Sequence, residues 1–359
     1  MKTVLILYGG RSGEHEVSLQ SAASVVYNLS AQWKILLAGI DKEGVWYLQP
    51  QSAVEAARAS AQKPLAITQD ENAALSIVPG RGAALAGRLL PIDVVFPVLH
   101  GSFGEDGLVQ GLLENARLAY VGAGVLGSAL SMDKDTAKRV WRDAGIPVTP
   151  FFTLRTEEPR EQAGKTAEAQ FGYPFFVKPS AAGSSVGISK VHAREEFFPA
   201  IDEAFRYDSK VLVEKALSAR EIECSVLGNL EPRAFTPGEI IPSHEFYDYN
   251  AKYIDSDGAR LLVPAALDDA AREKVKALAV RAYRAAEAEG MARVDFFLDK
   301  DSGGLYVNEI NTLPGFTGIS MFPRMCAHGG LSYAALLDEL LELGMERQRR
   351  REGLTFSYG

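Results

Sequence analysis

The hydrophobic residues in the first part of the chain follow a pattern of alternating strands and helices. Short apolar stretches predict buried strands, and stretches with helical spacing predict the helices between them. In chain order, these elements are expected at Thr3–Tyr8, Val17–Leu29, Trp33–Ile40, Ile92–Leu99, Gly107–Asn115 and Ala119–Val121. Such alternation is typical of an α/β domain with a parallel sheet. Residues from about 50 to 90 have little periodicity and indicate an insertion that elaborates this first domain.

A second domain is expected after a helix that runs from Met132 to Ala144 and stops at the break Gly145–Pro147. Beyond this break the pattern predicts short strands, with one long alanine-rich helix and a final helix. The strands are expected at Phe175–Lys178, Ile188–Val191, Lys210–Glu214, Glu221–Leu227, Arg293–Leu298 and Leu305–Ile310, and the helices at Asp268–Glu289 and from Tyr333.

Composition narrows the class of protein. A chain of 359 residues with 47% hydrophobic residues can bury two or three compact cores. The net charge is −8 and no basic block is present, which argues against a nucleic-acid or membrane partner. Cys224 and Cys326 are far apart without CxxC spacing, so we expect neither a disulfide framework nor a thiolate metal site. No stretch has transmembrane length or the form of a signal peptide, and we expect a cytoplasmic protein.

Two adjacent expected strands carry a candidate metal site. Alternation along them can aim Asp295, Glu309 and Asn311 at one point. Oxygen ligands of this kind suit magnesium, which prefers a few carboxylates together with nucleotide phosphates. Taken alone, the same acids could equally cap strands or face water.

A small-residue loop forms a candidate phosphate site. Lys178–Gly187 reads KPSAAGSSVG, in which small side chains let backbone amides approach phosphate oxygens and Lys178 adds a positive charge. The order is not that of a Walker motif, and an ordinary hairpin would have a similar composition. Further on, Glu214 and Lys215 end a hydrophobic strand where they could bond an adenine edge, and Glu221 could accept from ribose hydroxyls. The alternative for that pair is a solvated ion pair at a strand end.

The first glycine turn, Gly9–Glu14, resembles a dinucleotide fingerprint only in part. Its spacing is not GxGxxG, and Glu14 would place a carboxylate where a pyrophosphate should lie, so an NAD-binding interpretation is weak. Glu14 is better suited to an ammonium group. His100 closes a strand, and the polar aromatic segment Tyr247–Tyr253 could close over a site, although both patterns also occur in ordinary packing.

Taken together and in order, these segments resemble the D-alanine–D-alanine ligase family of the ATP-grasp superfamily, in its longer form. The resemblance covers essentially the whole chain. It is carried by GGRSGEHEVSL from Gly9, VLHGSFGEDGLVQG from Val98, SMDK from Ser131, VKPSAAGSSVGISKV from Val177, EKAL from Glu214, YDYNAKY from Tyr247, RVDFFLD from Arg293 and NEINTLPGFT from Asn308.

The resemblance implies an α/β fold of three domains. These are an N-terminal Rossmann-like domain over residues 1–130, a central ATP-grasp lid over 131–218, and a C-terminal catalytic domain with a large antiparallel-rich sheet over 219–359. It also implies ATP and magnesium, with two ions bound and manganese able to replace them. The implied nucleotide contacts are Lys134, Lys178, Ser185, Glu214, Lys215, Leu217, Glu221, Lys252 and Asn308, and the implied metal ligands are Asp295, Glu309 and Asn311.

The resemblance further implies the groups that hold D-alanine. Glu14 would bind the first ammonium group in a hydrogen-bonded set with Ser184 and Tyr253, with His100 close by. An oxyanion would be stabilised by Arg293 and the amide of Gly315. The second carboxylate would lie at Ser320, with Met321 beside it.

The implied reaction joins two D-alanine molecules through an acyl phosphate, with release of ADP and phosphate, for cell-wall precursor synthesis. The enzyme is expected to be a homodimer that associates through its first domain. An ester-forming ligase that uses D-lactate is the nearest alternative, and Tyr253 argues against it, because the family associates a tyrosine there with the dipeptide. A nucleotide-binding module without catalysis and an NAD oxidoreductase are the alternatives from other classes.

Overall fold

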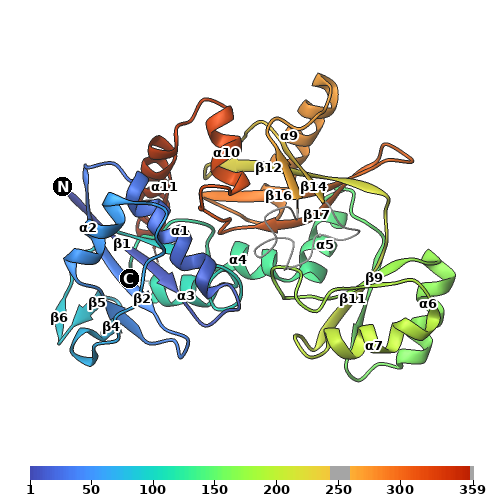
Figure 1. Ribbon diagram of the computed structural model, residues 1–359, viewed down its shortest axis with the longest axis horizontal. Coiled ribbons are helices and arrows are strands. Elements are labelled where there is room, and N and C mark those ends of the chain that lie inside the picture. Colours follow the sequence, from blue (N-terminus) through green and yellow to red (C-terminus); the bar gives the residue numbers. More distant parts are fainter. Residues whose placement is uncertain (243–258, 356–359) are drawn as a thin grey trace.

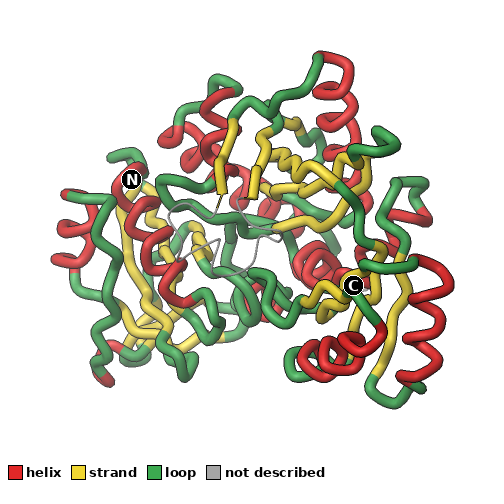
Figure 2. Tube along the Cα trace, turned by 45° about the vertical axis from the view of Figure 1, so that its right-hand side comes forward, coloured by secondary structure: helices red, strands yellow, loops and turns green. Residues whose placement is uncertain are grey.

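The computed structural model describes residues 1–242 and 259–355 of the chain. It contains three separate sheets that carry their own helices, together with a small fourth sheet. In Figure 1 the first sheet lies at the left with the N-terminus near it, the third lies at the upper right, and the second lies at the lower right. Figure 2 shows the same three bodies arranged around a central region.

The first sheet has the order β3-β2-β1-β7, and its three long strands are parallel. Its elements are β1 (Lys2–Gly9), α1 (His15–Asn28), β2 (Trp33–Ile40), β3 (Trp46–Leu48), β7 (Val94–Val98) and α3 (Leu108–Asn115). Alternate residues of β1 enter different cores: Ile6 packs on the side of α1, and Leu7 packs on the side of α3. Burial on both faces explains why β1 is an unbroken apolar run.

Residues between about 50 and 90 form ordered structure on the outside of this sheet. They hold α2 (Gln51–Ala59), the short 3₁₀ helix η1 (Glu71–Ala73) and a three-stranded antiparallel sheet. The strands of that sheet are β4 (Leu75–Val78), β5 (Gly82–Leu85) and β6 (Arg88–Leu89). The weak periodicity of the sequence concealed these elements because few of their side chains are fully buried.

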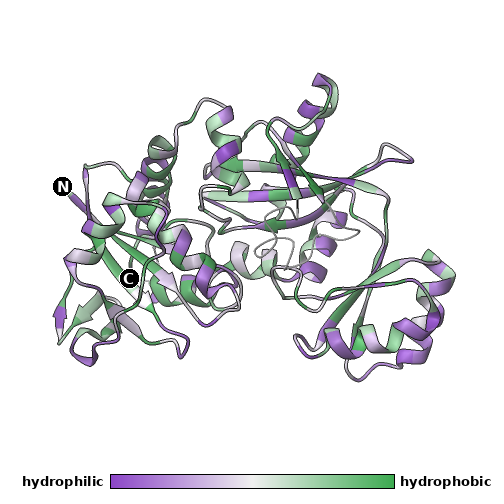
Figure 3. Cartoon of the chain, in the orientation of Figure 1, coloured by the Kyte–Doolittle hydropathy of each residue, from purple (hydrophilic) through white to green (hydrophobic). Residues whose placement is uncertain are grey.

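The second sheet, of order β10-β9-β11-β8, is antiparallel. Its elements are β8 (Phe151–Arg155), α6 (Arg160–Phe171), β9 (Phe175–Pro179), β10 (Ser189–Val191), α7 (Arg194–Ala204) and β11 (Lys210–Lys215). One face packs on α6 and α7 around Phe175 and Phe197, and Figure 3 shows this body with polar residues on the outer side of its helices. The loop between β9 and β10 leaves this sheet at its edge.

The third sheet has six strands, and β16 and β12 form its centre. Its elements are β12 (Ala219–Leu227), β13 (Arg233–Ala234), β14 (Gly238–Pro242), β15 (Ala259–Leu262), α9 (Asp269–Ala285), β16 (Met291–Asp299), β17 (Leu305–Asn311) and α10 (Met321–His328). Two helices that link the first sheet to the rest, α4 (Val125–Met132) and α5 (Lys134–Asp143), also contact β17. Inward residues such as Cys224 and Val294 pack with α9 and α5 in one core. The residues between them along these strands are mostly charged, so the opposite face is polar.

The last helix, α11 (Tyr333–Glu352), follows the third sheet in the chain but packs into the core of the first. Near its end, Arg347 is almost fully buried. Its guanidinium donates to the carbonyl oxygens of Gly122 and Tyr120 and lies 4.1 Å from the centre of the Tyr120 ring. This contact fixes α11 to the segment that leads into α4.

Replacing Arg347 by methionine is expected to destabilise the protein by about 2–4 kcal/mol, because two buried carbonyl groups lose a charged donor. The shift in the midpoint of urea unfolding measures this effect. Arg349→Met, which removes an exposed arginine from the same helix, serves as the control and is expected to change stability by no more than about 0.5 kcal/mol. Equal unfolding midpoints for the two variants would contradict the conclusion that Arg347 fixes α11 to the segment before α4.

The expected elements agree closely with those of the structure. Ala119–Val121 is an exception, because it forms only a single parallel bridge from Tyr120 to Val95 and not a strand. The expected helix Asp268–Glu289 ends earlier, at Ala285. The expected aromatic segment, Tyr247–Tyr253, lies outside the described residues.

Candidate functional site

A large cavity, of about 1150 Å³, lies where the three bodies meet. Every predicted site residue that the structure describes lines this cavity. They are Glu14, His100, Lys134, Lys178, Ser184, Ser185, Glu214, Lys215, Leu217, Glu221, Arg293, Asp295, Asn308, Glu309, Asn311, Gly315, Ser320 and Met321. Lys252 and Tyr253 lie outside the described residues.

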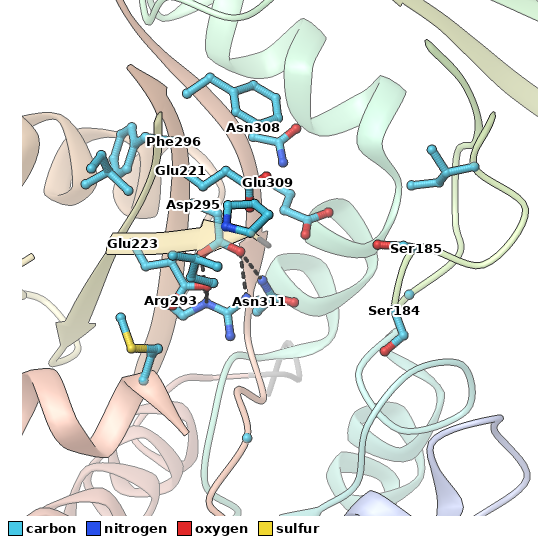
Figure 4. A pocket seen from close by; sticks show the side chains of 18 of the residues that line it. Ser184, Ser185, Glu221, Glu223, Arg293, Asp295, Phe296, Asn308, Glu309 and Asn311 are labelled. Carbon is cyan, nitrogen blue, oxygen red and sulfur yellow. Dashed lines mark hydrogen bonds and ion pairs between the residues drawn. The ribbon is translucent and has the colours of Figure 1, made fainter. Parts of the chain in front are cut away.

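One wall of the cavity is the polar face of β12, β16 and β17. Register places Asp295 opposite Glu309, and Asn311 donates to Asp295 Oδ2 at 3.0 Å. The pairing then skips Asn308, since Phe296 faces Val307, and this irregularity lies directly after Asp295. A bulge of this kind lets two neighbouring residues of β17 turn to the same side. Figure 4 shows Asn308 and Glu309 beside Asp295 at this wall.

These side chains fit a magnesium ion held partly by a nucleotide. Asp295 and Glu309 supply carboxylates and Asn311 supplies an amide oxygen, all hard ligands. Among residues 1–242 and 259–355, no group of three His, Cys, Asp or Glu side chains could hold a metal alone. Within the same residues, Oδ1 of Asn308 is buried and accepts no hydrogen bond. An oxygen in that state suits a ligand that brings its own donors or cations.

Arg293 lies at the centre of the acidic wall. It donates to both carboxylate oxygens of Asp295 at 2.7 Å, and its Nε lies 3.1 Å from Glu223. Burial opposes the guanidinium charge, but these two acids outweigh it and raise the pKa of Arg293 well above its ordinary value. The group is therefore a permanent cation, held in a fixed plane beside the cavity.

The facing wall carries lysines from the second body and from α5. Lys178 pairs with Oε1 of Glu214 at 2.6 Å, and both line the cavity. Lys134 donates to the carbonyl oxygen of Ala182 at 2.7 Å and lies 3.4 Å from Glu309. Lys134 thus faces a carboxylate of the opposite wall, and Lys178 lines the same cavity, an arrangement that suits a polyphosphate with its metal ion.

The loop between β9 and β10 crosses from the lysine wall to the first body. Ser184 donates to Oε1 of Glu14 at 2.5 Å, across a sequence separation of 170 residues. Ser184 and Ser185 both have positive φ, a conformation that costs about 1–3 kcal/mol for such residues. Gly101 has a positive φ, and a Cβ there would lie 2.7 Å from Glu14 Oε2, so glycine suits this close approach. Figure 4 shows the two serines across the site from the strands.

The end of the cavity at Glu14 contains one carboxyl group that sequence reasoning missed. Glu105 accepts from the amide of Gly101 at 2.8 Å, and burial together with the charge of Glu14 raises its pKa to about 8. His100 contacts Ser21 at 3.0 Å, and burial lowers its pKa. Glu105 is part of the GSFGEDG segment already identified, but only the fold places it beside Glu14.

Glu223 was also missed, although its position carries a usable signal. It lies on β12 two residues after Glu221, so both point to the same face, and register places it opposite Asp295. Charged residues at alternate positions of a central strand, with apolar residues between them, indicate a strand that borders a cavity.

The remaining end of the cavity is the start of α10. Ser320 is the residue before this helix, and its Oγ accepts from the amide of Thr317 at 2.9 Å. The side chain of Ser320 makes no capping hydrogen bond to the first amides of α10, and Ser320 and Met321 line the cavity. A Cβ on Gly315 would lie 2.7 Å from Ser320 Oγ, so a larger residue there would push the Ser320 hydroxyl out of its present position. Uncapped amides at a helix start favour a carboxylate.

Comparison with known proteins gives full-length matches. The family model described as D-ala D-ala ligase N-terminus matches residues 3–123, and the one described as D-ala D-ala ligase C-terminus matches residues 140–342. A D-alanine–D-alanine ligase of Treponema denticola is 45% identical over 353 residues, with 96% of each chain covered.

Solved structures agree with this fold. A D-alanine–D-alanine ligase from Coxiella burnetii superposes with a TM-score of 0.85 and 37% identity, covering 98% of this chain and 96% of that one. The VanG D-Ala:D-Ser ligase from Enterococcus faecalis superposes with a TM-score of 0.83 and 37% identity, covering 96% and 99%. The two structures bear names that differ in the second amino acid joined.

Proposed function

This chain belongs to the D-alanine–D-alanine ligase family, and from that premise we propose that its cavity joins two D-alanine molecules with conversion of ATP to ADP and phosphate. The observation that carries the proposal is the meeting, in one cavity, of an acidic strand wall, a lysine wall and an uncapped helix start. These suit a metal ion, a triphosphate and an amino-acid carboxylate.

The first D-alanine is held at both of its charged ends. Glu14, fixed by Ser184, accepts from its ammonium group, while Glu105 and His100 complete the polar end of the cavity. Arg293 and the amide of Gly315 lie along the cavity towards its carboxylate. This arrangement leaves one carboxylate oxygen to attack the γ-phosphate of ATP and form an acyl phosphate.

The phosphate chain lies between the two charged walls. Lys134 and Lys178 screen the charge of the phosphates, and Asp295, Glu309 and Asn311 supply the oxygen ligands for magnesium or manganese. When bound, the metal polarises phosphoryl oxygens and neutralises developing charge. The adenine lies towards Glu214 and Leu217, and the ribose towards Glu221.

The second D-alanine presents its amine to the activated carbonyl carbon. Ser320 and the first amides of α10 hold its carboxylate, as the direction of the helix dipole favours. Attack of the amine gives a tetrahedral oxyanion, which Arg293 and the amide of Gly315 stabilise. The ammonium group loses one proton to solvent before this attack and a second proton after it. The bond from carbon to the phosphate oxygen then breaks, phosphate leaves with that oxygen, and the peptide bond remains.

The second substrate distinguishes members of the family from one another. D-lactate would give an ester, and D-serine is the partner in the name of the Enterococcus faecalis relative. Tyr253 supports D-alanine, because the family associates a tyrosine in its segment with dipeptide formation. The alternatives of a non-catalytic nucleotide module and an NAD oxidoreductase lack support from the family match.

A competition assay tests this choice. Purified protein with ATP and magnesium is given D-alanine alone, L-alanine alone, and D-alanine with equal D-lactate or D-serine, and the products are identified by mass. We expect ADP release to require D-alanine. D-alanyl-D-alanine is expected to be the main product of every mixture that contains D-alanine. A main product that contains lactate or serine would assign the enzyme to another member of the family.

We also propose a homodimer that works in the cytoplasm on cell-wall precursors. Phe103, Leu108 and Leu112 are exposed and line one small hollow at the start of α3, and Leu126 on the neighbouring α4 is exposed as well. A cluster of this kind indicates a protein contact. In the described residues no helix is both long and apolar enough to cross a membrane. Sedimentation is expected to show the mass of a dimer for the wild-type protein and of a monomer for Leu112→Glu. A wild-type protein that sediments as a monomer would contradict this proposal.

A further inference from the structure

A fully buried lysine lies directly behind the nucleotide end of the cavity. Lys138 lies on α5 one turn after Lys134, and its side chain is completely removed from solvent. Its ammonium group lies 2.8 Å from Oε2 of Glu214. Glu214 lines the cavity and Lys138 does not, so the closest contact between Lys138 and the cavity wall is its ion pair with Glu214.

The position of Lys138 does not require a charge for packing. Its neighbours on the inward side of α5, Ala137 and Trp141, are apolar and belong to the core with α9. Removing an ammonium group from water is unfavourable, and apolar residues often replace buried ion pairs without loss of stability. Within the described residues, Nζ of Lys138 forms no hydrogen bond of good geometry and has the ion pair with Glu214 as its compensation.

Glu214 therefore lies between two ammonium groups, one on each carboxylate oxygen. Lys178 lies 2.6 Å from Oε1, and Lys138 lies 2.8 Å from Oε2. Burial raises the pKa of Glu214, but the two lysines outweigh it, and the net effect lowers the pKa. Burial lowers the pKa of Lys138, and the charge of Glu214 opposes this effect. With all three groups ionised, two cations and one anion leave this group of three with one positive charge. With Lys178 alone, Glu214 would neutralise the cation that faces the phosphates.

We propose that Lys138 is a positioning residue for nucleotide recognition, which fixes Glu214 as the acceptor for the adenine amino group and leaves the charge of Lys178 uncompensated for phosphate. The inference deepens the proposed function and rests on its placement of adenine at Glu214. A structural role alone would stabilise the fold without affecting which base is bound.

The test compares ADP with inosine diphosphate, which has a carbonyl oxygen in place of the adenine amino group. Binding of both is measured by calorimetry to the wild-type protein and to Lys138→Met. Loss of a well-placed charged acceptor changes affinity by about tenfold or more, so we expect the preference for ADP over inosine diphosphate to fall by about tenfold. Affinity for both nucleotides also falls, while KM for D-alanine stays within about twofold.

A double-mutant cycle identifies the route of the effect. In a Glu214→Gln background, adding Lys138→Met is expected to change the ADP preference by less than about twofold, because the acceptor through which Lys138 acts is already gone. Arg347→Met is the matched control for loss of a buried cation. Arg347→Met is expected to lower stability, because Arg347 is buried, and to leave the preference for ADP over inosine diphosphate unchanged. If Lys138→Met does not fold, Lys138→Gln takes its place with the same expected results.

Two results would overturn the inference: a folded variant that keeps the wild-type ADP preference, or an equal loss in the presence and absence of Glu214. The proposed function fails separately. Wild-type protein that binds ADP but never consumes D-alanine would refute the ligase assignment and leave Lys138 testable. Turnover of D-alanine with an unchanged ADP preference in the variants would refute only the role of Lys138.

Discussion

Replacing Glu309 by glutamine is expected to abolish magnesium-dependent turnover, with a fall of about 10³-fold or more. Glu309 faces Asp295 across β16 and β17 and lies 3.4 Å from Lys134, so it joins the acidic wall to the lysine wall. A metal that neutralises developing phosphoryl charge contributes several kcal/mol, and each 1.4 kcal/mol is about tenfold in rate. Glutamine keeps the shape of the side chain and removes the charge.

The decisive readout for this variant is nucleotide binding, measured with and without magnesium. We expect ADP binding without magnesium to be retained and the gain on adding magnesium to disappear. Glu339→Gln is the matched control, because Glu339 pairs with Arg233 on the surface outside the cavity. It should turn over at the wild-type rate. Near-normal turnover in Glu309→Gln would overturn the metal assignment.

Replacing Arg293 by lysine is expected to lower kcat by about 10²–10³-fold, the usual loss when one oxyanion donor is removed. Lysine keeps a positive charge between Glu223 and Asp295, so the buried acids keep a counter-ion. Lysine lacks the planar guanidinium group. In Arg293 this group donates two hydrogen bonds to Asp295 and has a further N–H left for the cavity.

Thermal unfolding and ADP binding separate this loss from misfolding. Both are expected to remain near wild type in Arg293→Lys while kcat falls. Arg233→Lys, which alters a bidentate pair with Glu339 on the surface, provides the control. A kcat within about threefold of wild type would show that Arg293 does not stabilise the transition state.

Much of this site could be predicted from the sequence because its residues lie on strongly patterned elements. Apolar runs or alternation fix the bounds of β1, β2, β16 and β17. The alternation along β16 and β17 also predicts that Asp295, Glu309 and Asn311 lie close together. The roles came from the ordered motifs, which identify a family more surely than any one segment could.

Other parts depend on contacts that a linear pattern does not encode. The bulge in β17 lets the consecutive residues Asn308 and Glu309 turn to the same side of the sheet. It is a register shift that appears only when the strands are paired. In the sequence Lys138 is one of several charged residues of a helix, and only the packing of β11 against α5 brings Glu214 to it. The strands of the small sheet β4–β6 are short and mix buried, half-buried and exposed residues, so their sequence carries no strong period.

The most direct test of the central claim uses D-alanine labelled with ¹⁸O in its carboxylate. The labelled substrate is incubated with the protein, ATP and magnesium, and both the dipeptide and the released phosphate are analysed by mass. The account predicts D-alanyl-D-alanine and ADP in equal amounts, with one labelled oxygen transferred to each phosphate. Release of AMP and pyrophosphate, or a dipeptide formed with unlabelled phosphate, would contradict activation through an acyl phosphate.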